Sequence, residues 1–242
     1  MYVDLHPCFL LHKKAFRETS LLLEVFSERH GRVGLVAKGA ARKKHRSPLQ
    51  PFLPLQMAWS GRGELGNLIN AEADGKPQSL SGERLFSGYY VNELLVRLLH
   101  RHDPCPELFR VYQQTLVELA ETDCIDSTLR RFEKRLLEEL GYGPILDHDV
   151  SSGEEIDPMA WYHYLEGRGP CVTHSAEVKG SGIKVKGETL LLLEAEGKLR
   201  KRESRIEAKR LMRYLLSPLL GNKPLHSRRI FETMKTKEDR NG

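Results

Sequence analysis

A dense group of cationic side chains lies in the first fifth of the chain. Between residues 38 and 46 the sequence has five Lys or Arg, one His and no acidic residue; the five are Lys38, Arg42, Lys43, Lys44 and Arg46. Ammonium and guanidinium groups bind phosphate oxygens, and such contacts are independent of nucleotide sequence and weaken steeply with salt. The alternative is a solvated surface loop that binds nothing. The elements around the run decide between these two interpretations.

Apolar, strand-like segments flank the run, residues 33–37 before it and 52–59 after it. They belong to a region of about 75 residues with about five short strand patterns and no strong helical period. The patterns cover residues 8–12, 19–26, 32–37, 52–59 and 64–69. This predicts a small closed barrel, most commonly an oligonucleotide-binding (OB) fold, with an SH3-like barrel as the rival. A loop between barrel strands would present its charge to a polyanion without burying it.

The second part of the chain has a different period. Gly75, Lys76 and Pro77 mark a boundary, after which apolar residues recur at helical spacing. We expect helices near residues 85–98, 108–119, 129–140, 188–194 and 206–216, and an irregular insert with small hairpins at 147–187. The predicted fold class is α+β, with a five-stranded OB-fold nucleic-acid-binding domain in residues 1–79 and a mainly α-helical domain in residues 80–242.

Charge is segregated along the chain. Residues 1–76 carry a net charge of +5, residues 77–197 carry −9 and residues 198–242 carry +9. Basic ends around an acidic middle indicate a polyanion partner that is held at selected faces. The C-terminal basic cluster includes Arg205, Lys209 and Arg213 at helical i, i+4 spacing. It could extend a nucleic-acid path, dock an acidic peptide or simply be solvated.

An OB barrel binds single strands with a positive groove and aromatic stacking platforms. The predicted DNA-binding residues are the five cations of the run together with Arg32 and Arg62, and Lys13, Lys14, Arg17 and Arg29 could extend the groove. Candidate platforms are Phe16, Phe26, Phe52 and Trp59. Filling the barrel core is the competing role for these aromatic residues.

Motifs for catalysis are missing from the sequence. It has no phosphate-binding glycine loop followed by Lys-Ser/Thr, no Gly-x-Ser-x-Gly and no His-Glu-x-x-His. His148, Cys171 and His174 lie in one region, but a structural zinc site usually has paired Cys or His on both halves. We therefore expect no enzyme activity, no metal and no cofactor.

Four scattered Cys predict reduced thiols. The N-terminal residues lack the layout of a signal peptide, and no apolar run is long enough to span a membrane. These features predict a cytoplasmic protein that does not bind membranes.

Several stretches, in this order and spacing, resemble the RecO family of bacterial DNA repair proteins. They are residues 19–26 (TSLLLEVF), 31–33 (GRV), 35–40 (LVAKGA), 49–52 (LQPF), 61–65 (GRGEL), 90–95 (YVNELL), 129–133 (LRRFE), 140–143 (LGYG), 221–225 (GNKPL) and 227–228 (SR). Together they extend over nearly the whole chain.

The resemblance implies a recombination mediator of the RecF-type pathway, associated with the nucleoid. Such proteins bind single- and double-stranded DNA, anneal complementary strands, and work with RecR to help load the RecA recombinase onto DNA coated by single-stranded DNA-binding protein. They engage the acidic C-terminal tail of that coating protein and hydrolyse no nucleotide. Many relatives have a four-Cys zinc finger in the insert. Here Cys171 is the only Cys of that region, so the chain resembles the subgroup without the metal.

An acidic tail that ends in an apolar residue requires an apolar pocket with a cationic rim. The predicted residues for this site are Arg130, Arg131, Lys209 and Arg213. The alternative for the two neighbouring Arg is pairing with Glu133, Glu138 or other acids of the middle segment. Two other functions remain open: a nuclease or nucleotidyl enzyme, which would need clustered metal-binding carboxylates, and an RNA-binding or ribosome-associated barrel protein.

Overall fold

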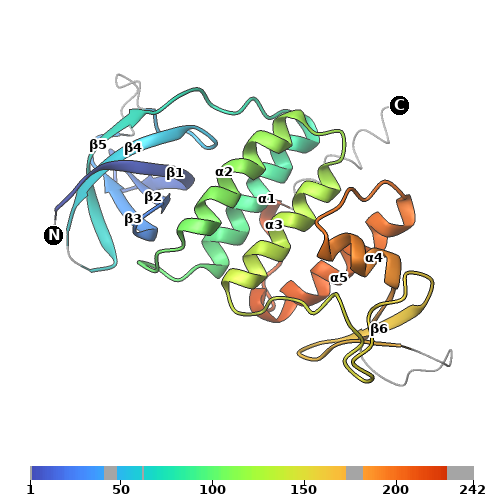
Figure 1. Cartoon of the computed structure of the whole chain (residues 1–242). Coiled ribbons are helices and arrows are strands. Elements are labelled where there is room, and N and C mark those ends of the chain that lie inside the picture. The colour runs from blue at the N-terminus through green and yellow to red at the C-terminus, as the bar shows by residue number, and fades with distance from the viewer. Residues whose placement is uncertain (1, 41–47, 62, 173–181, 228–242) are drawn as a thin grey trace. The chain divides into compact units, whose positions relative to one another are not determined.

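The structure is a computed structural model that describes residues 2–40, 48–61, 63–172 and 182–227 (Figure 1). The chain divides into two compact units. The first comprises residues 1–121 and the segment that begins at Pro224, and the second comprises Thr122–Lys223. Within the described residues, no helix is long and apolar enough to cross a membrane.

Five strands form the N-terminal barrel: β1 (Tyr2–Phe16), β2 (Ser20–Ser27), β3 (Gly31–Ala37), β4 (Pro54–Ser60) and β5 (Leu65–Ala73). Each strand pairs with two others, so the sheet closes in the order β1-β2-β3-β5-β4 and back to β1. The pairing of β3 with β5 is parallel and the other four are antiparallel. The predicted five-stranded OB-type architecture is therefore confirmed.

The barrel encloses a compact apolar core because inward positions alternate with outward ones along each strand. Leu10, Leu23, Leu35 and Met57 are fully buried in this core. Gly31 opens β3 with a φ of +60°, and a Cβ atom there would lie 1.8 Å from the backbone oxygen of Asp103. Glycine is therefore required at the turn between β2 and β3.

Two helices of the first unit pack on the barrel: α1 (Gly82–Leu98) and α2 (Pro106–Glu121). The rings of Phe9 and Tyr112 lie 5.1 Å apart, centre to centre. The Tyr112 hydroxyl donates a hydrogen bond to Asn92, whose amide donates to the backbone oxygen of Leu11 on β1. The predicted domain boundary at residue 79 falls between β5 and α1, whereas the contacts place α1 and α2 in the same compact unit as the barrel.

The segment that begins at Pro224 is attached to α1 by one carboxylate. Glu93 accepts hydrogen bonds from the backbone N–H of His226 at 2.8 Å and from the backbone N–H and hydroxyl of Ser227 at 2.9 and 2.6 Å. This explains why the first unit includes residues from both ends of the sequence.

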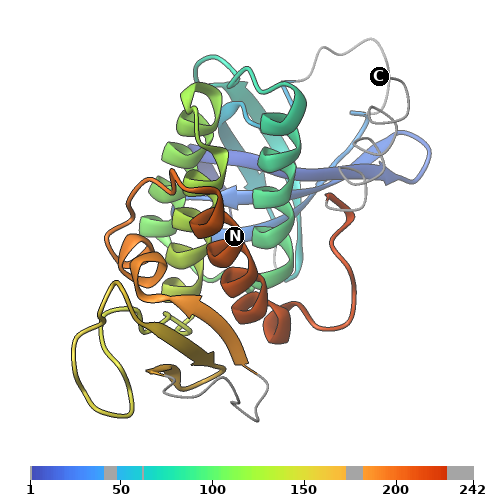
Figure 2. The same cartoon turned by 90° about the vertical axis from the view of Figure 1, so that its right-hand side faces the viewer.

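The second unit combines helices with a small sheet. Its helices are α3 (Ile125–Glu139), α4 (Gly187–Glu194) and α5 (Arg202–Leu220), and its strands are β6 (Trp161–Leu165), β7 (Gly169–Val172) and β8 (Gly182–Lys186). The antiparallel sheet has the order β7-β6-β8 and lies beside α4 and α5 (Figure 2). Tyr162, Tyr164 and Val185 are buried and form the inner side of this sheet. The insert expected as irregular hairpins is thus a three-stranded sheet.

Candidate nucleic-acid interface

One end of the barrel gathers exposed cations from segments that are distant in sequence. Lys38 follows β3 directly, and its neighbour Ala37 pairs with Leu21 at the start of β2. The turn before β2 and the adjoining end of β1 carry the other cations. We call Lys13, Lys14, Arg17 and Lys38 the cationic end of the barrel; all four are exposed.

A hydrogen bond fixes the two parts of the cationic end together. The Lys13 ammonium group donates to the backbone oxygen of Leu49 at 2.7 Å. Leu49 is buried in the barrel core, so the described C-terminal side of the β3–β4 connection is held against the β1–β2 hairpin. One acid, Glu18, is exposed in the same turn. The arrangement suits the binding of a polyanion by several cations at once.

Five of the predicted DNA-binding residues lie outside the described residues. They are Arg42, Lys43, Lys44, Arg46 and Arg62. The described residues Ala40 and Pro48 flank the first four, and both belong to the β3–β4 connection beside the cationic end. Their role in DNA binding remains a prediction.

Arg32 is engaged within the first unit. Its guanidinium donates to Glu24 at 2.8 Å and to the backbone oxygen of Leu99 at 2.9 Å, and its side chain is largely buried. Arg101 binds the other oxygen of Glu24. Arg32 therefore joins the barrel to the end of α1, and we do not include it in the proposed DNA contact.

Three of the four candidate stacking residues are core residues. Phe26, Phe52 and Trp59 are buried, so the competing core role holds for them. Phe16 is half-buried at the end of β1, and the Arg17 guanidinium lies 5.2 Å from its ring centre. Phe16 is the one candidate platform that belongs to the cationic end.

The residues predicted for partner-tail binding fall into two groups. Arg130 is only 4% exposed and forms an ion pair with Glu133 at 2.7 Å, which places it in the interior of the second unit. Arg131 is partly exposed and lies 3.7 Å from Glu196. Lys209 and Arg213 are exposed on α5. The predicted alternative of pairing with Glu133 thus holds for Arg130, which cannot form the rim of a surface pocket.

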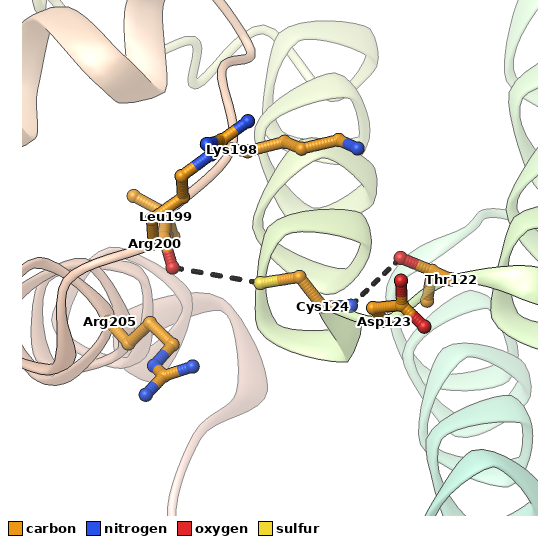
Figure 3. Close-up of a pocket in the computed structure, with 7 residues that line it drawn as sticks. All are labelled: Thr122, Asp123, Cys124, Lys198, Leu199, Arg200 and Arg205. Carbon is orange, nitrogen blue, oxygen red and sulfur yellow. Dashed lines mark hydrogen bonds between the residues drawn. The ribbon is translucent and has the colours of Figure 1, made fainter.

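A different cationic pocket opens in the second unit at the start of α3 (Figure 3). It has a volume of about 330 Å³ and is lined by Thr122, Asp123, Cys124, Lys198, Leu199, Arg200 and Arg205. In the view of Figure 3, Lys198 lies above and Arg205 below the hydrogen bond from the Cys124 thiol to the Leu199 oxygen. Three cations and the positive N-terminal end of α3 outweigh the single acid.

The pocket wall is held by contacts between segments that are far apart in the sequence. The backbone N–H of Leu199 donates to the Ser127 hydroxyl at 2.8 Å, and the Cys124 sulfur lies 3.6 Å from the Leu199 oxygen. Leu199 itself is buried. The sequence shows the basic cluster, but no pattern in it indicates that residue 199 adjoins residue 127.

The residues with zinc-like spacing do not form a metal site in the described part of the chain. No group of three potential ligands lies together there. Asp147 receives a hydrogen bond from His148, which lowers the pKa of that carboxyl group. Burial raises the pKa of the Cys171 thiol. His174 lies outside the described residues.

The fold and the cationic end define an α+β protein built on an OB-type barrel. Two family models match the chain, Recombination protein O N terminal over residues 4–74 and Recombination protein O C terminal over residues 79–229. It is similar to the DNA repair protein RecO of Nitrosococcus oceani, with 46% identity over 97% of this chain and 95% of the relative. The corresponding protein of Methylococcus capsulatus is 46% identical over 96% of this chain and 94% of the relative. The chain therefore belongs to the RecO family of DNA repair proteins.

Proposed function

We propose that the protein is a recombination mediator that acts at the nucleoid in the cytoplasm. In this role it binds single- and double-stranded DNA, anneals complementary strands and, together with RecR, helps to load RecA onto DNA coated by single-stranded DNA-binding protein. In this role the protein holds DNA strands and catalyses no making or breaking of covalent bonds. Membership of the RecO family supports this proposal.

The observation that carries the DNA-binding part is the cationic end of the barrel. Lys14, at the end of β1, Arg17, in the β1–β2 turn, and Lys38, directly after β3, are all exposed there. Contacts of this kind bind the phosphate backbone of any sequence. Annealing requires sequence-independent binding, because the protein has to hold both complementary strands.

Strand annealing tests the proposal. We expect the protein to accelerate the pairing of complementary DNA strands without ATP, both bare and coated with single-stranded DNA-binding protein. Equal or faster pairing of RNA strands would favour the RNA-binding alternative, and cleavage of either strand with a divalent metal would favour a nuclease.

We further propose that the acidic tail of the coating protein binds in the pocket lined by Lys198, Arg200 and Arg205. The three cations suit the acidic residues and terminal carboxylate of such a tail. The apolar wall at Leu199 and Cys124 suits its apolar last residue. In this proposal the tail site lies at the start of α3 and does not include Arg130.

The triple variant Lys198→Gln, Arg200→Gln and Arg205→Gln should bind a peptide of the acidic tail up to about 100-fold more weakly, because each partly exposed ion pair contributes up to about 1 kcal/mol. Fluorescence anisotropy of a labelled peptide measures this loss. A control triple, Lys76→Gln, Arg110→Gln and Lys223→Gln, removes the same charge elsewhere. Equal loss in the control, or loss only when Lys209 and Arg213 are replaced, would contradict the pocket assignment.

A further inference from the structure

The outer face of the small sheet in the second unit carries an aromatic and cationic row. Along β6, Tyr162 and Tyr164 point inward, so Trp161, His163 and Leu165 point outward. On β8, Lys186 pairs with Trp161 and Lys184 pairs with His163, and directly opposed residues share a face. Trp161 and the two lysines therefore stand together on the outer face.

This face is open and has no acidic residue among its strand positions. Trp161 is 41% exposed, and the Lys184 ammonium group lies 4.9 Å from its ring centre. On β7, Cys171 pairs with His163 and completes the row. In the described part of the chain, neither Lys184 nor Lys186 forms an ion pair with a carboxylate. A single exposed Trp is ordinary, but this one lies opposite Lys186 and beside Lys184.

Several described acids in and beside the insert have hydrogen-bond partners of their own. Asp149 is buried and accepts hydrogen bonds from Ser151 and from the backbone of Val172. Asp157 accepts from the backbone of Met159. Glu188, next to β8, is paired with Lys201 at 2.5 Å, and this hydrogen bond, with the charges of Lys201 and Lys186, lowers the pKa of its carboxyl group. The described strand positions of the outer face carry Lys184 and Lys186 and no acidic residue.

We infer that this outer face binds single-stranded DNA, with a base stacked on Trp161 and backbone phosphates on Lys184 and Lys186. An aromatic ring beside lysines on a flat sheet is a platform that accepts any base. An acidic peptide would use the lysines but not the indole. The inference rests on the proposed DNA binding and adds a second contact, separate from the barrel.

The chain offers a direct reporter for this contact, because it has only two Trp. Trp59 is buried in the barrel, with 6% of its surface exposed. In a Trp59→Phe variant, Trp161 is the single indole. An unlabelled thymidine oligonucleotide should quench its fluorescence saturably, whereas an abasic strand of equal length should quench it little.

Three variants complete the test. Trp161→Ala should lower the affinity for single-stranded DNA about five- to tenfold, and Lys184→Gln with Lys186→Gln should lower it about tenfold and reduce the salt dependence. A Trp161→Phe variant, which retains Trp59, serves as the complement if Trp59→Phe folds poorly. Its remaining fluorescence should not change with DNA.

The anisotropy of a labelled oligonucleotide in the same samples distinguishes failure of the sheet contact from failure of DNA binding as a whole. If its anisotropy saturates while the Trp161 fluorescence does not change, the protein binds DNA but the proposed sheet contact is wrong. If the anisotropy does not change at all, the proposed DNA binding itself fails. Equal quenching by polyglutamate or by the abasic strand would overturn base stacking.

Discussion

The triple variant Lys14→Gln, Arg17→Gln and Lys38→Gln should bind single-stranded DNA about 100-fold more weakly than the wild type at 0.1 M salt. Each lost phosphate contact reduces the slope of log affinity against log salt by about 0.7, so three contacts reduce it by about 2. A change of 2 in this slope corresponds to about 100-fold at 0.1 M salt. Titrations of labelled DNA at several salt concentrations measure both quantities.

This variant spares Lys13 because its hydrogen bond to Leu49 holds the β3–β4 connection in place. The control variant Lys76→Gln, Arg110→Gln and Lys223→Gln has the same net charge. It should retain most of the affinity for single-stranded DNA and the full salt dependence. Neutralising Arg42, Lys43, Lys44 and Arg46 should reduce the slope further, by up to about 3 on single-stranded DNA and up to about 4 on double-stranded DNA. An unchanged slope in the Lys14, Arg17 and Lys38 variant would show that the cationic end is only solvated.

Arg130→Ala should destabilise the protein by on the order of 3–5 kcal/mol, because it removes the cation that faces a buried carboxylate. Glu133 is only 1% exposed, and the Arg130 guanidinium lies 2.7 Å from it. Urea unfolding measures the loss. Arg131→Ala is the matched control, and since its pair with Glu196 is partly exposed we expect a loss below about 1 kcal/mol.

A double variant separates loss of the pair from loss of packing. Arg130→Met with Glu133→Leu replaces both charges with apolar side chains of similar size and should restore most of the stability lost in Arg130→Ala. Equal stability of the Arg130→Ala and Arg131→Ala variants would contradict the assignment of Arg130 to the interior. A loss of tail-peptide binding in Arg130→Ala alone would not locate the tail site, because this variant is expected to unfold easily.

The sequence predicts the barrel well because its strands are short, apolar and separated by turn residues. The limits of β1 are less clear, since it extends from Tyr2 to Phe16 through the polar residues 12–14. These residues pair with β2 although they have no apolar pattern of their own. Backbone pairing with a strong neighbour, rather than local preference, sets the length of this strand.

The position of Arg130 shows where charge alone misleads. Two adjacent Arg on a predicted helix suggest a cationic surface, yet Arg130 shares a helix face with Glu133 and Leu137. The i, i+3 pairing with Glu133 and the i, i+7 spacing to Leu137 are signals that place it on the buried face. The pocket beside Leu199 and the third strand of the insert depend on contacts between distant segments, which local patterns do not contain.

The most direct test of the central claim is strand annealing by the wild-type chain and by the Lys14, Arg17 and Lys38 variant, on bare DNA and on DNA coated with single-stranded DNA-binding protein. We expect the wild type to anneal both substrates. The variant should anneal bare strands far more slowly while it still binds the tail peptide with unchanged affinity. Undiminished annealing of bare strands by a folded variant would contradict the assignment of DNA binding to the cationic end of the barrel.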